Sequence, residues 1–409
     1  MSSLVRRKVL LVHPRPDAMG GAEAVAAQIL VWLLSYQDVE VTLLTLAPVD
    51  WKKLEAVAGQ PLPVERIVNR IASVPGIVSR FAGGLTLLKI AFLHRTAKRY
   101  ARDFDLCIGA HGEIDFGRPG FQYIHHPAFA PKRFLRRHGV FVGNSVVDRL
   151  RVAESLYRGA LFLVSGDRRR GYRRNVTAVN SHFMRNFVRE VYGLEAEVVY
   201  PVFLRKEKLG GLRWEQRRFR LVALGRIAPD KGYAGLIDIF ARVQRKFPAA
   251  EFLIMGESAD PVYEASLREH ARAEGVTVSF EPNAGSAQVW ETLSSSMFFV
   301  HGRKFEHFGI AILEAVAAGC LAFVHDSGGQ TEIVRSPLLR YKEPADIVRG
   351  IELLLQDAGV RNAAMKELRH TAEEFLGRDF GEELERVLLP LWDVHAPGLV
   401  DSGKNRPLQ

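Results

Sequence analysis

The feature that most constrains the fold is an alternation of short apolar runs with longer helical patterns, which continues through almost the whole 409-residue chain. Runs such as Val9–Val12 and Phe219–Leu224 have the length of strands. They are followed by helical patterns such as Ala22–Leu34 and Tyr233–Lys246. This alternation is the sequence form of parallel βαβ units, so it predicts the α/β class.

The same pattern predicts the remaining elements of the sheet layers and the helices that cover them. The expected strands are Val41–Leu46, Asp105–Gly109, Gln122–Ile124, Glu197–Tyr200, Glu251–Met255, Val276–Phe280, Met297–Val300 and Leu321–Val324. The expected helices are Leu85–Arg102, Phe183–Tyr192, Tyr263–Glu274 and Gly309–Ala318, with two or three more at the end of the chain.

The alternation is interrupted once, which indicates two domains. Pro201 and the polar, basic stretch Arg205–Arg218 break the pattern before it restarts at Phe219. A chain of this length also exceeds the usual size of one compact domain. The expected organisation is a first Rossmann-like domain (1–204), a second (205–380), a helix that crosses back to the first domain (381–394) and a loose tail (395–409).

The two cysteines and the hydropathy of the chain indicate the cellular compartment in which the protein is expected. Cys107 and Cys320 lie in separate apolar stretches, so a disulfide framework is not expected and a reducing compartment is favoured. The apolar run near the start is too short for a signal peptide, and no stretch approaches the ~20 apolar residues of a spanning helix. We therefore expect a cytoplasmic protein, either soluble or peripheral on the cytoplasmic membrane face.

The net charge of +10 is concentrated in one segment, residues 131–174. Three acidic residues, Asp148, Glu154 and Asp167, stand there against twelve basic ones. The basic residues are Lys132, Arg133, Arg136, Arg137, Arg149, Arg151, Arg158, Arg168, Arg169, Arg170, Arg173 and Arg174. Apolar residues are set among them: Phe134, Leu135, Val140, Phe141, Val142, Leu161, Phe162 and Leu163. The mixture fits a solvated face or an anionic bilayer surface equally well. Nucleic acid is not expected as a partner, because no aromatic stacking motif accompanies the charge.

The stretch from Glu306 to Gly319 carries the most specific chemical pattern. Gly309 follows a strand and a polar turn, and the apolar run after it is helical. The backbone N–H groups at such a helix start favour an anion such as a diphosphate. Glu306 and Glu314 lie up to two turns apart, with backbones ~9–12 Å from each other. This separation suits two polyols joined by a diphosphate, although a helix-end Glu and an unrelated interior Glu would give the same spacing.

Positive side chains for a diphosphate are offered by the stretch Gly225-Arg226-Ile-Ala-Pro-Asp-Lys231-Gly232. It lies between a predicted strand and a predicted helix, so Arg226 and Lys231 belong to one loop. Arg can bind phosphate oxygens bidentately and Lys as a point charge. Taken alone, a basic loop of this kind is more often merely solvated.

Together, the two motifs resemble the donor-binding half of family 4 glycosyltransferases, retaining enzymes with the GT-B fold of two Rossmann-like domains facing across a cleft. The wording Glu306-His-Phe-Gly-Ile, followed by Ser327-Gly328-Gly329, is most similar to that of the α-1,2-mannosyltransferases that elongate lipid-linked oligosaccharides. The resemblance covers the chain from Val9 to about Leu391. It is specific in the C-terminal motifs and looser in the first half.

The resemblance implies roles for individual residues around a nucleotide-sugar donor. Arg226 and Lys231 would hold the diphosphate and offset charge on the departing nucleotide. Glu306 would face the transferred sugar and Glu314 the ribose. The backbone amides of Phe308, Gly309 and Ile310 would bind the distal phosphate.

The resemblance also extends to two places in the first half of the chain. Gly20 and Gly21, after Met19, are similar to the family's glycine loop, where glycine allows close backbone approach, although alone they would be read as an ordinary turn. Tyr123-Ile-His125-His126-Pro127 is similar to the segment of the active-site histidine. His125 matches that histidine better than His126 does, and the choice between them stays open.

The chemistry implied is metal-independent transfer with retention of configuration and without a cofactor, since the nucleotide sugar is a substrate. Asp103-Phe-Asp105 is reminiscent of a metal-binding Asp-x-Asp, but it falls at a helix–strand junction where Asp is common. No His/Cys/Asp motif has metal-ligand spacing. In the family no agreed nucleophile exists, so Glu306 is assigned to positioning.

The expected acceptor is a glycan bound mainly by the first domain, and a lipid-linked one is preferred because the basic, apolar-dotted segment lies in that half. The alternatives are transfer to a soluble small molecule or protein, and a non-catalytic binding protein on the same fold. The transferred sugar is expected to be a hexose, with mannose from GDP-mannose suggested by the Glu306 motif.

Overall fold

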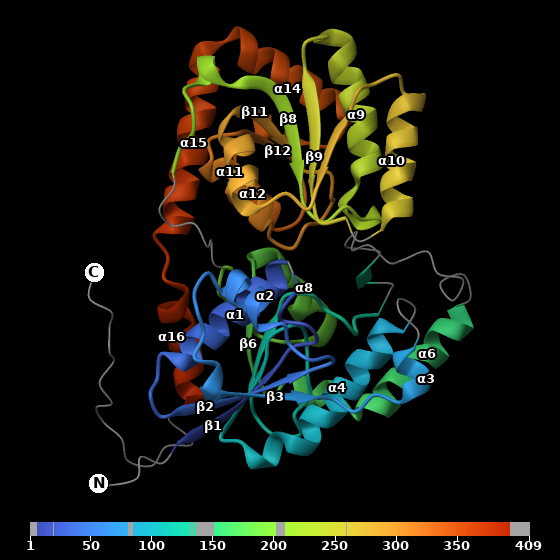
Figure 1. The fold of residues 1–409 in the computed structure, drawn as a ribbon, viewed down its shortest axis with the longest axis vertical. Helices are drawn as coiled ribbons and strands as arrows, with labels where there is room; N and C mark the ends of the chain where they lie inside the picture. The colour runs from blue at the N-terminus through green and yellow to red at the C-terminus, as the bar shows by residue number, and fades with distance from the viewer. Residues whose placement is uncertain are drawn as a thin grey trace. The chain divides into compact units, whose positions relative to one another are not determined.

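The computed structural model describes residues 6–18, 20–80, 85–131, 134–135, 151–201, 209–258 and 260–392, with the backbone alone at 151–155. These residues form two compact units (Figure 1). The described residues up to 201, together with those from 379 onward, make unit 1, and those from 209 to 378 make unit 2. The expected boundary between residues 204 and 205, the tail 395–409 and Met19 lie outside the described residues.

Unit 1 is built on a seven-stranded parallel sheet. In sheet order the strands are β3 (Ile67–Ile71), β2 (Val39–Thr45), β1 (Arg7–Val12), β4 (Leu106–Gly109), β5 (Phe121–Ile124), β6 (Val176–Val179) and β7 (Glu197–Val198). The helices are α1 (Gly21–Leu34), α2 (Trp51–Ala58), α3 (Gly76–Ser79), α4 (Thr86–Tyr100), α6 (Arg151–Ser165), α7 (Arg169–Tyr172), α8 (His182–Tyr192) and α16 (Phe380–Trp392), with short 3-10 turns at η1 (Val64–Arg66) and η2 (Ala101–Asp103).

The sheet of unit 1 is apolar on both faces because helices cover both. Along β1, Val9 and Leu11 pack into the cluster that contains α1, α2 and α16, whereas Leu10 and Val12 pack with α4. This two-residue alternation is what a strand buried on both faces requires. It explains why the strand reads as a continuous apolar run.

Helix α16 is the last described helix of the chain, and it packs into the core of unit 1, against α1 and β6. Its buried side chains are Phe380, Leu384, Val387 and Leu388. At its end the Trp392 ring lies 5.6 Å from that of Trp32 and 5.4 Å from that of Tyr36, between centroids. The guanidinium of Arg7 lies 4.8 Å from the centroid of the Trp392 ring. These contacts fix the end of the helix on unit 1 through aromatic and cation–π packing.

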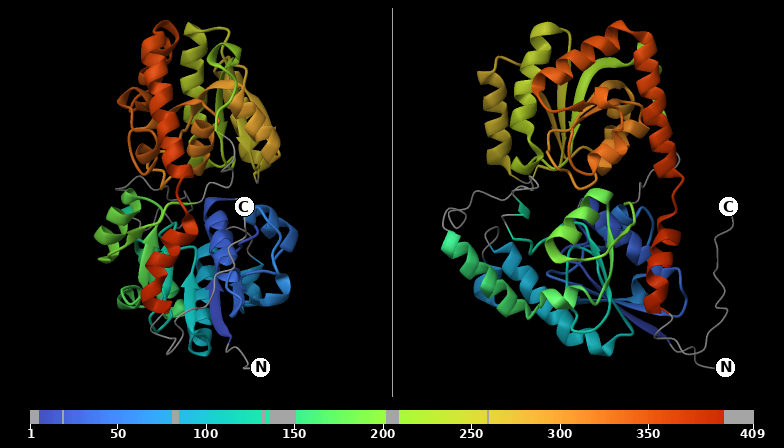
Figure 2. Two further views of the ribbon diagram at one scale, coloured as in Figure 1. Left: turned by 90° about the vertical axis from the view of Figure 1, so that its left-hand side faces the viewer. Right: turned by 180° about the vertical axis from the view of Figure 1, so that it is seen from behind.

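Unit 2 is built on a six-stranded parallel sheet. Its order is β10 (Ser279–Pro282), β9 (Glu251–Gly256), β8 (Arg218–Leu224), β11 (Ser296–Val300), β12 (Leu321–His325) and β13 (Arg340–Tyr341). The helices are α9 (Tyr233–Lys246), α10 (Pro261–Ala273), α11 (Ser286–Ser294), α12 (Ile310–Ala317), α13 (Gln330–Ile333), α14 (Pro344–Gln356) and α15 (Ala358–Leu376), with 3-10 turns η4 (Trp214–Gln216), η5 (Pro229–Lys231) and η6 (Pro337–Leu339). Helices α9 and α10 lie on one side of the strands, and α11 and α12 on the other (Figures 1 and 2).

The α/β class predicted from the alternation is confirmed, with differences in detail. Strands β3, β6 and β13 and helices α2, α6 and α11 are not among the expected elements. The strand expected at Val276–Phe280 lies at Ser279–Pro282.

The two cysteines are buried free thiols. Among the described helices, none is long and apolar enough to cross a membrane.

Candidate functional site

The two sheets share a topological property that locates candidate sites. In unit 2 the chain runs outward from β8 to β10 on one side and continues from β11 to β13 on the other. In unit 1 the order reverses in the same way between β1 and β4. Ligands of open α/β sheets bind beyond the carboxyl ends of the strands at such a reversal. Ligand sites are therefore expected at the loops after β8 and β11, and at those after β1 and β4.

In unit 2 the two predicted motifs meet at this reversal. The loop after β8 carries Lys231, and the loop after β11 carries Glu306. Although they are 75 residues apart in sequence, Lys231 Nζ lies 2.9 Å from Glu306 Oε2. The Glu306 side chain is only 10% exposed, so this ion pair is largely shielded from water.

Glu306 is surrounded by further donors that the sequence analysis does not assign. His301 Nε2 lies 3.2 Å from Oε2, and Arg303 Nη1 lies 3.6 Å from Oε1. The backbone N–H of His307 donates to Oε1 at 3.0 Å. Burial by itself would raise the pKa of Glu306, but the charges of Arg303 and Lys231 and the contact with His301 hold that pKa well below its ordinary value. The carboxylate is therefore ionised at neutral pH and acts as a hydrogen-bond acceptor.

The imidazole of His301 is the neutral partner in this cluster. Burial lowers its pKa, and this outweighs the opposing effect of Glu306. A neutral ring can place its proton on Nε2 and donate it to the carboxylate. Its backbone carbonyl accepts a hydrogen bond from the Tyr341 hydroxyl at 2.7 Å, which holds the end of β11 in place.

Asp230 links Arg226 to the same cluster. Its Oδ1 lies 3.7 Å from Arg226 Nη2, and its Oδ2 lies 3.4 Å from Arg303 Nη1. Arg226 is 55% exposed, so it can turn toward a ligand, whereas Lys231 is 20% exposed. Three cations and two carboxylates leave the group with a net positive charge, as a diphosphate site requires.

Two glycines allow these loops to come together. Gly232 has a φ of +72°, and a Cβ at that position would lie 2.6 Å from the carbonyl oxygen of Gly302, so the loop after β8 touches the loop after β11. Gly309 has a φ of +106° and precedes α12, and no side chain caps this helix start. Both positions need a conformation that glycine adopts at low cost.

Four of the predicted donor-binding residues, Phe308, Gly309, Ile310 and Glu314, lie at the start of α12 or within it, whereas Gly20 and Gly21 lie at the start of α1 in unit 1. Phe308 is buried, and its ring lies 5.4 Å from that of Phe375. Ile310 is the first residue of the helix, and Glu314, half-buried, lies one turn further along. The glycine pair Gly328-Gly329 lies near Glu306, because the backbone N–H of Gly329 donates to the Glu306 carbonyl at 2.8 Å. The roles assigned to these residues stay predictions.

Sequence reasoning missed Asp230, His301 and Arg303. Two signals could have found them. His301 is the first residue after β11, the position from which a side chain reaches a ligand site, and Arg303 lies three residues before Glu306. Asp230 offers no signal of its own, since an Asp in a polar loop is ordinary.

In unit 1 the predicted histidine pair follows β5 directly. His125 and His126 are both half-buried, and both backbone N–H groups donate to the His111 carbonyl at 3.3 Å. Gly20 is the residue before α1, and Gly21 is the first residue of that helix.

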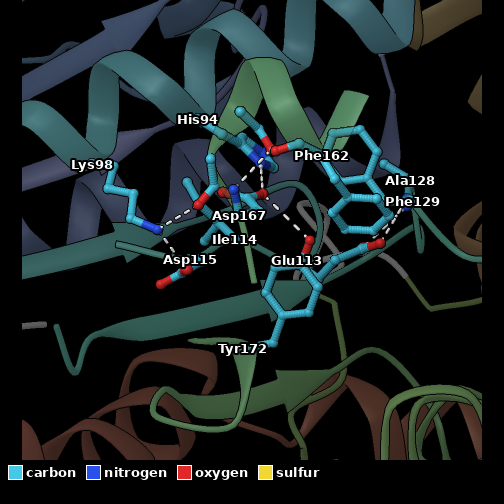
Figure 3. Close-up of polar contacts among 12 residues, drawn as sticks. His94, Lys98, Glu113, Ile114, Asp115, Ala128, Phe129, Phe162, Asp167 and Tyr172 are labelled. Carbon is cyan, nitrogen blue, oxygen red and sulfur yellow. Dashed lines mark hydrogen bonds and ion pairs between the residues drawn. The ribbon is translucent and has the colours of Figure 1, made fainter. Parts of the chain in front are cut away.

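A buried carboxylate holds the loop that carries these histidines. Glu113 accepts hydrogen bonds from the backbone N–H groups of Ala128, at 3.0 Å, and Phe129, at 2.6 Å (Figure 3). The Tyr192 hydroxyl donates to the same carboxylate. Burial raises the pKa of Glu113, although the hydrogen bonds from the Tyr192 hydroxyl and the Phe129 backbone N–H oppose that shift. These hydrogen bonds to Glu113 fix the loop after His125.

A second part of this network holds the chain at Asp167 and Arg168, near the end of the basic segment 131–174 (Figure 3). Asp115 Oδ2 accepts hydrogen bonds from Lys98 Nζ at 2.7 Å and from the backbone N–H of Arg168 at 3.0 Å. Asp167 Oδ2 lies 2.7 Å from His94 Nδ1. The chain is thus held at Asp167 and Arg168, directly before the exposed arginines that follow.

The described acidic groups include one cluster with the geometry of a metal site. Asp238, His270 and Glu274 place one ligand atom each within 4.8 Å of one another on α9, α10 and the residue after α10. This cluster is not among the sites predicted from the sequence. Asp105 of the Asp-x-Asp triplet has a structural partner, because its Oδ2 accepts from the backbone N–H of Lys8 at 2.8 Å.

Comparison with known proteins agrees with this geometry. Residues 205–372 match the family model of glycosyl transferases group 1. The match covers most of the second unit. The resemblance predicted from the motifs of Lys231 and Glu306 is thereby confirmed.

Two curated relatives of this chain carry the same name, GDP-Man:Man(3)GlcNAc(2)-PP-Dol alpha-1,2-mannosyltransferase. The Neurospora crassa protein is 24% identical over 314 residues, which cover 66% of this chain and 56% of the relative. The Xenopus laevis protein is 29% identical over 123 residues, covering 28% and 25%. This chain thus spans from a quarter to just over half the length of these relatives.

A solved structure extends the likeness to both units. Anabaena HepE, in complex with UDP and glucose, superposes with a TM-score of 0.64 over 95% of this chain and 100% of that one, at 16% identity. At this identity the comparison shows the fold alone. The GT-B class of two Rossmann-like units predicted for the chain is confirmed.

Proposed function

We propose that the protein is a retaining, metal-independent glycosyltransferase that moves a hexose from a nucleotide-sugar donor to a glycan acceptor. The observation that carries the proposal is the cluster of Lys231, Arg303 and His301 around the ionised Glu306, beside the uncapped start of α12. It combines cations for a diphosphate with a carboxylate for sugar hydroxyls. A GDP-mannose donor is supported by the names of the mannosyltransferase relatives.

In this proposal the donor diphosphate lies between the loop after β8 and the start of α12. Lys231 exchanges part of its contact with Glu306 for the phosphate, and Arg226 turns in from solvent. The backbone N–H groups at Gly309 and Ile310 and the positive helix end add to this attraction. These groups stabilise the charge that develops on the departing nucleotide, the role a divalent cation has in other enzymes.

The chemical step is a substitution at the anomeric carbon. A bond forms from an acceptor hydroxyl oxygen to that carbon while the bond to the diphosphate oxygen breaks, and the hydroxyl proton passes to the departing phosphate on the same face. Glu306 positions the sugar hydroxyls. Its low pKa makes it a weak base, which fits positioning better than proton abstraction.

For the acceptor we favour a lipid-linked glycan presented at an anionic membrane surface. Support comes from the segment that ends at Arg174, of which six basic side chains are described, and of these Arg168, Arg169, Arg170, Arg173 and Arg174 are exposed. Leu156 and Leu163 on α6 are 70% and 80% exposed. Seven residues apart, they share one face of the helix. Exposed leucines near arginines fit a bilayer edge.

The test is hydrolysis of a panel of nucleotide sugars without acceptor, followed by transfer to a lipid-linked oligosaccharide and to a soluble glycan. Release of the nucleoside diphosphate from one donor, with retained anomeric configuration in the product and undiminished rate in a chelator, supports the proposal. A folded protein that neither binds nor hydrolyses any donor of the panel contradicts it. A soluble acceptor used in preference to the lipid-linked one would replace the proposed acceptor only.

A further inference from the structure

Three histidines and an asparagine follow four neighbouring strands in the sheet of unit 1. His13 follows β1, His111 lies two residues after β4, His125 follows β5, and Asn180 follows β6. These strands are adjacent in the order β1-β4-β5-β6, so the four side chains share the carboxyl edge of the sheet. His13 and His111 stand on the two strands between which the strand order reverses, where open α/β sheets bind ligands. We call these four residues the histidine row.

The members of the histidine row contact one another. The rings of His13 and His111 meet edge to face with centroids 5.4 Å apart. The His111 carbonyl accepts from the backbone N–H of His125, and Asn180 Nδ2 lies 3.4 Å from His125 Nδ1. The row is thus one continuous edge of ring nitrogens and an amide, with His13 buried and His111 half-buried.

His13 has a ring nitrogen that its surroundings do not satisfy. Its Nδ1 accepts a hydrogen bond from the backbone N–H of Arg15 at 3.2 Å, so the proton of the neutral ring belongs on Nε2. This Nε2 is buried and has no hydrogen-bond partner among the described residues. A buried donor left unpaired is unfavourable, and such a group calls for a ligand or a water to complete it.

The charge state of the row indicates what kind of ligand fits it. Burial, reinforced by the neighbouring imidazoles, lowers the pKa of His13 well below its ordinary value and that of His111 to about 4. Both rings are therefore neutral at neutral pH. A neutral imidazole offers one donor and one acceptor, which matches a hydroxyl group and does not attract a phosphate.

We propose that His13 and His111 bind hydroxyl groups of the acceptor saccharide and thereby select it. The inference rests on the proposed function and deepens it, because it assigns acceptor recognition to two residues beyond His125. The half-buried His111 contacts the sugar from the exposed side. The buried His13 donates its Nε2–H to a saccharide hydroxyl, and its ring packs edge to face on the His111 ring and orients it.

Substitutions at His13 separate this role from a structural one. His13→Asn keeps an acceptor for the Arg15 N–H but removes the distal donor, whereas His13→Gln restores a donor near the position of Nε2. Loss of one neutral hydrogen bond should raise the acceptor KM roughly 3- to 10-fold in His13→Asn, with partial rescue in His13→Gln. His111→Asn should raise the acceptor KM at least as much. His370→Asn, an exposed histidine on α15, is the matched control.

The experiment measures acceptor KM, donor hydrolysis without acceptor, and melting temperature for each variant. As a readout independent of turnover, saturation-transfer NMR with methyl α-mannoside and methyl α-glucoside reports saccharide binding to the folded protein. Weaker saccharide binding and a raised acceptor KM, with donor hydrolysis unchanged, support the proposal.

Two outcomes would overturn the inference. If donor hydrolysis falls while the acceptor KM is unchanged, the row binds the donor hexose and not the acceptor. If His13→Asn lowers only the melting temperature, the row is structural. Both results are distinct from failure of the proposed function, in which wild-type protein itself uses no donor.

Discussion

The exposed arginines that follow α6 allow a quantitative test of membrane attachment. We consider replacement of Arg168, Arg169 and Arg170 by Ser. All three side chains are exposed, and the backbone before them is anchored by the hydrogen bond from the Arg168 N–H to Asp115, which the substitution keeps. The change therefore removes three charges without removing a described buried contact.

The magnitude follows from the exposure of these side chains. Each Lys or Arg near an anionic bilayer contributes about 1 kcal/mol at low ionic strength, so three contribute about 3 kcal/mol. Since 1.4 kcal/mol corresponds to a tenfold change, vesicle affinity should fall roughly 100-fold, and less if the charges lie beyond a Debye length of the surface. Leu163→Ser, at the 80% exposed position on α6, should lower vesicle affinity further if that leucine inserts into the bilayer.

The assay is sedimentation with vesicles of phosphatidylglycerol and phosphatidylcholine, at low and at physiological salt. Replacing Arg242, Arg245 and Arg272 by Ser is the control, because it removes the same charge from exposed positions of unit 2. Donor hydrolysis should be unchanged in both triple variants. Equal sedimentation of the Arg168–Arg170 variant and wild type, or wild-type protein that ignores anionic vesicles at low salt, would refute the reasoning and leave a solvated face. Salt-sensitive retention of an oligonucleotide would point to nucleic acid instead.

Three further predictions concern the two sites. Lys231→Ala should weaken nucleotide-diphosphate binding and slow transfer ~10²–10³-fold, since it removes a cation facing the departing charge; near-normal turnover by the folded variant in a steady-state assay would contradict the assignment. Glu314→Gln should mainly raise the donor KM, whereas Glu306→Gln should mainly lower kcat, and steady-state kinetics with the same effect for both would argue against separate roles. Because the native pKa of His111 is lowered from 6.5 to about 4, the unfolded chain takes up a proton first as the pH falls through this window, so folding stability declines there. Urea unfolding at about pH 7 and pH 5 should show a loss roughly 1–2 kcal/mol smaller in His111→Asn than in wild type, and an equal loss would speak against a neutral buried ring.

The parts of the fold that the sequence predicted are those with strong periodicity. Strand β3 escaped because it is an edge strand whose residues Val68 and Ile71 are 55% and 50% exposed, with Asn69 and Arg70 between them. Strand β6 has only four residues and begins two residues after Arg174, so the charged residues before it masked its short apolar run. Strand β10 was placed early because Val276 and Val278 resemble a strand start, whereas pairing with β9 begins at Ser279.

The candidate site was predictable only where a motif carries it. Lys231 and Glu306 belong to recognisable local patterns, and the contact between them follows once both loops are placed at one sheet edge. The histidine row has no local pattern, since His13 and His111 are 98 residues apart. Their proximity depends on β1 and β4 being neighbours, a choice of strand order that short-range periodicity does not encode.

Helix α16 has a consequence for how the molecule is made. The core of unit 1 is completed by Phe380, Leu384 and Leu388, which the ribosome delivers only after the whole of unit 2. Unit 2 is nearly continuous in sequence and can fold during its synthesis. Until α16 is synthesised, the apolar surface beside α1 in unit 1 stays uncovered. A gene fragment ending near residue 201 would leave that groove permanently open. Joining residues 379–392 to such a fragment through a flexible linker is the simplest way to obtain unit 1 alone.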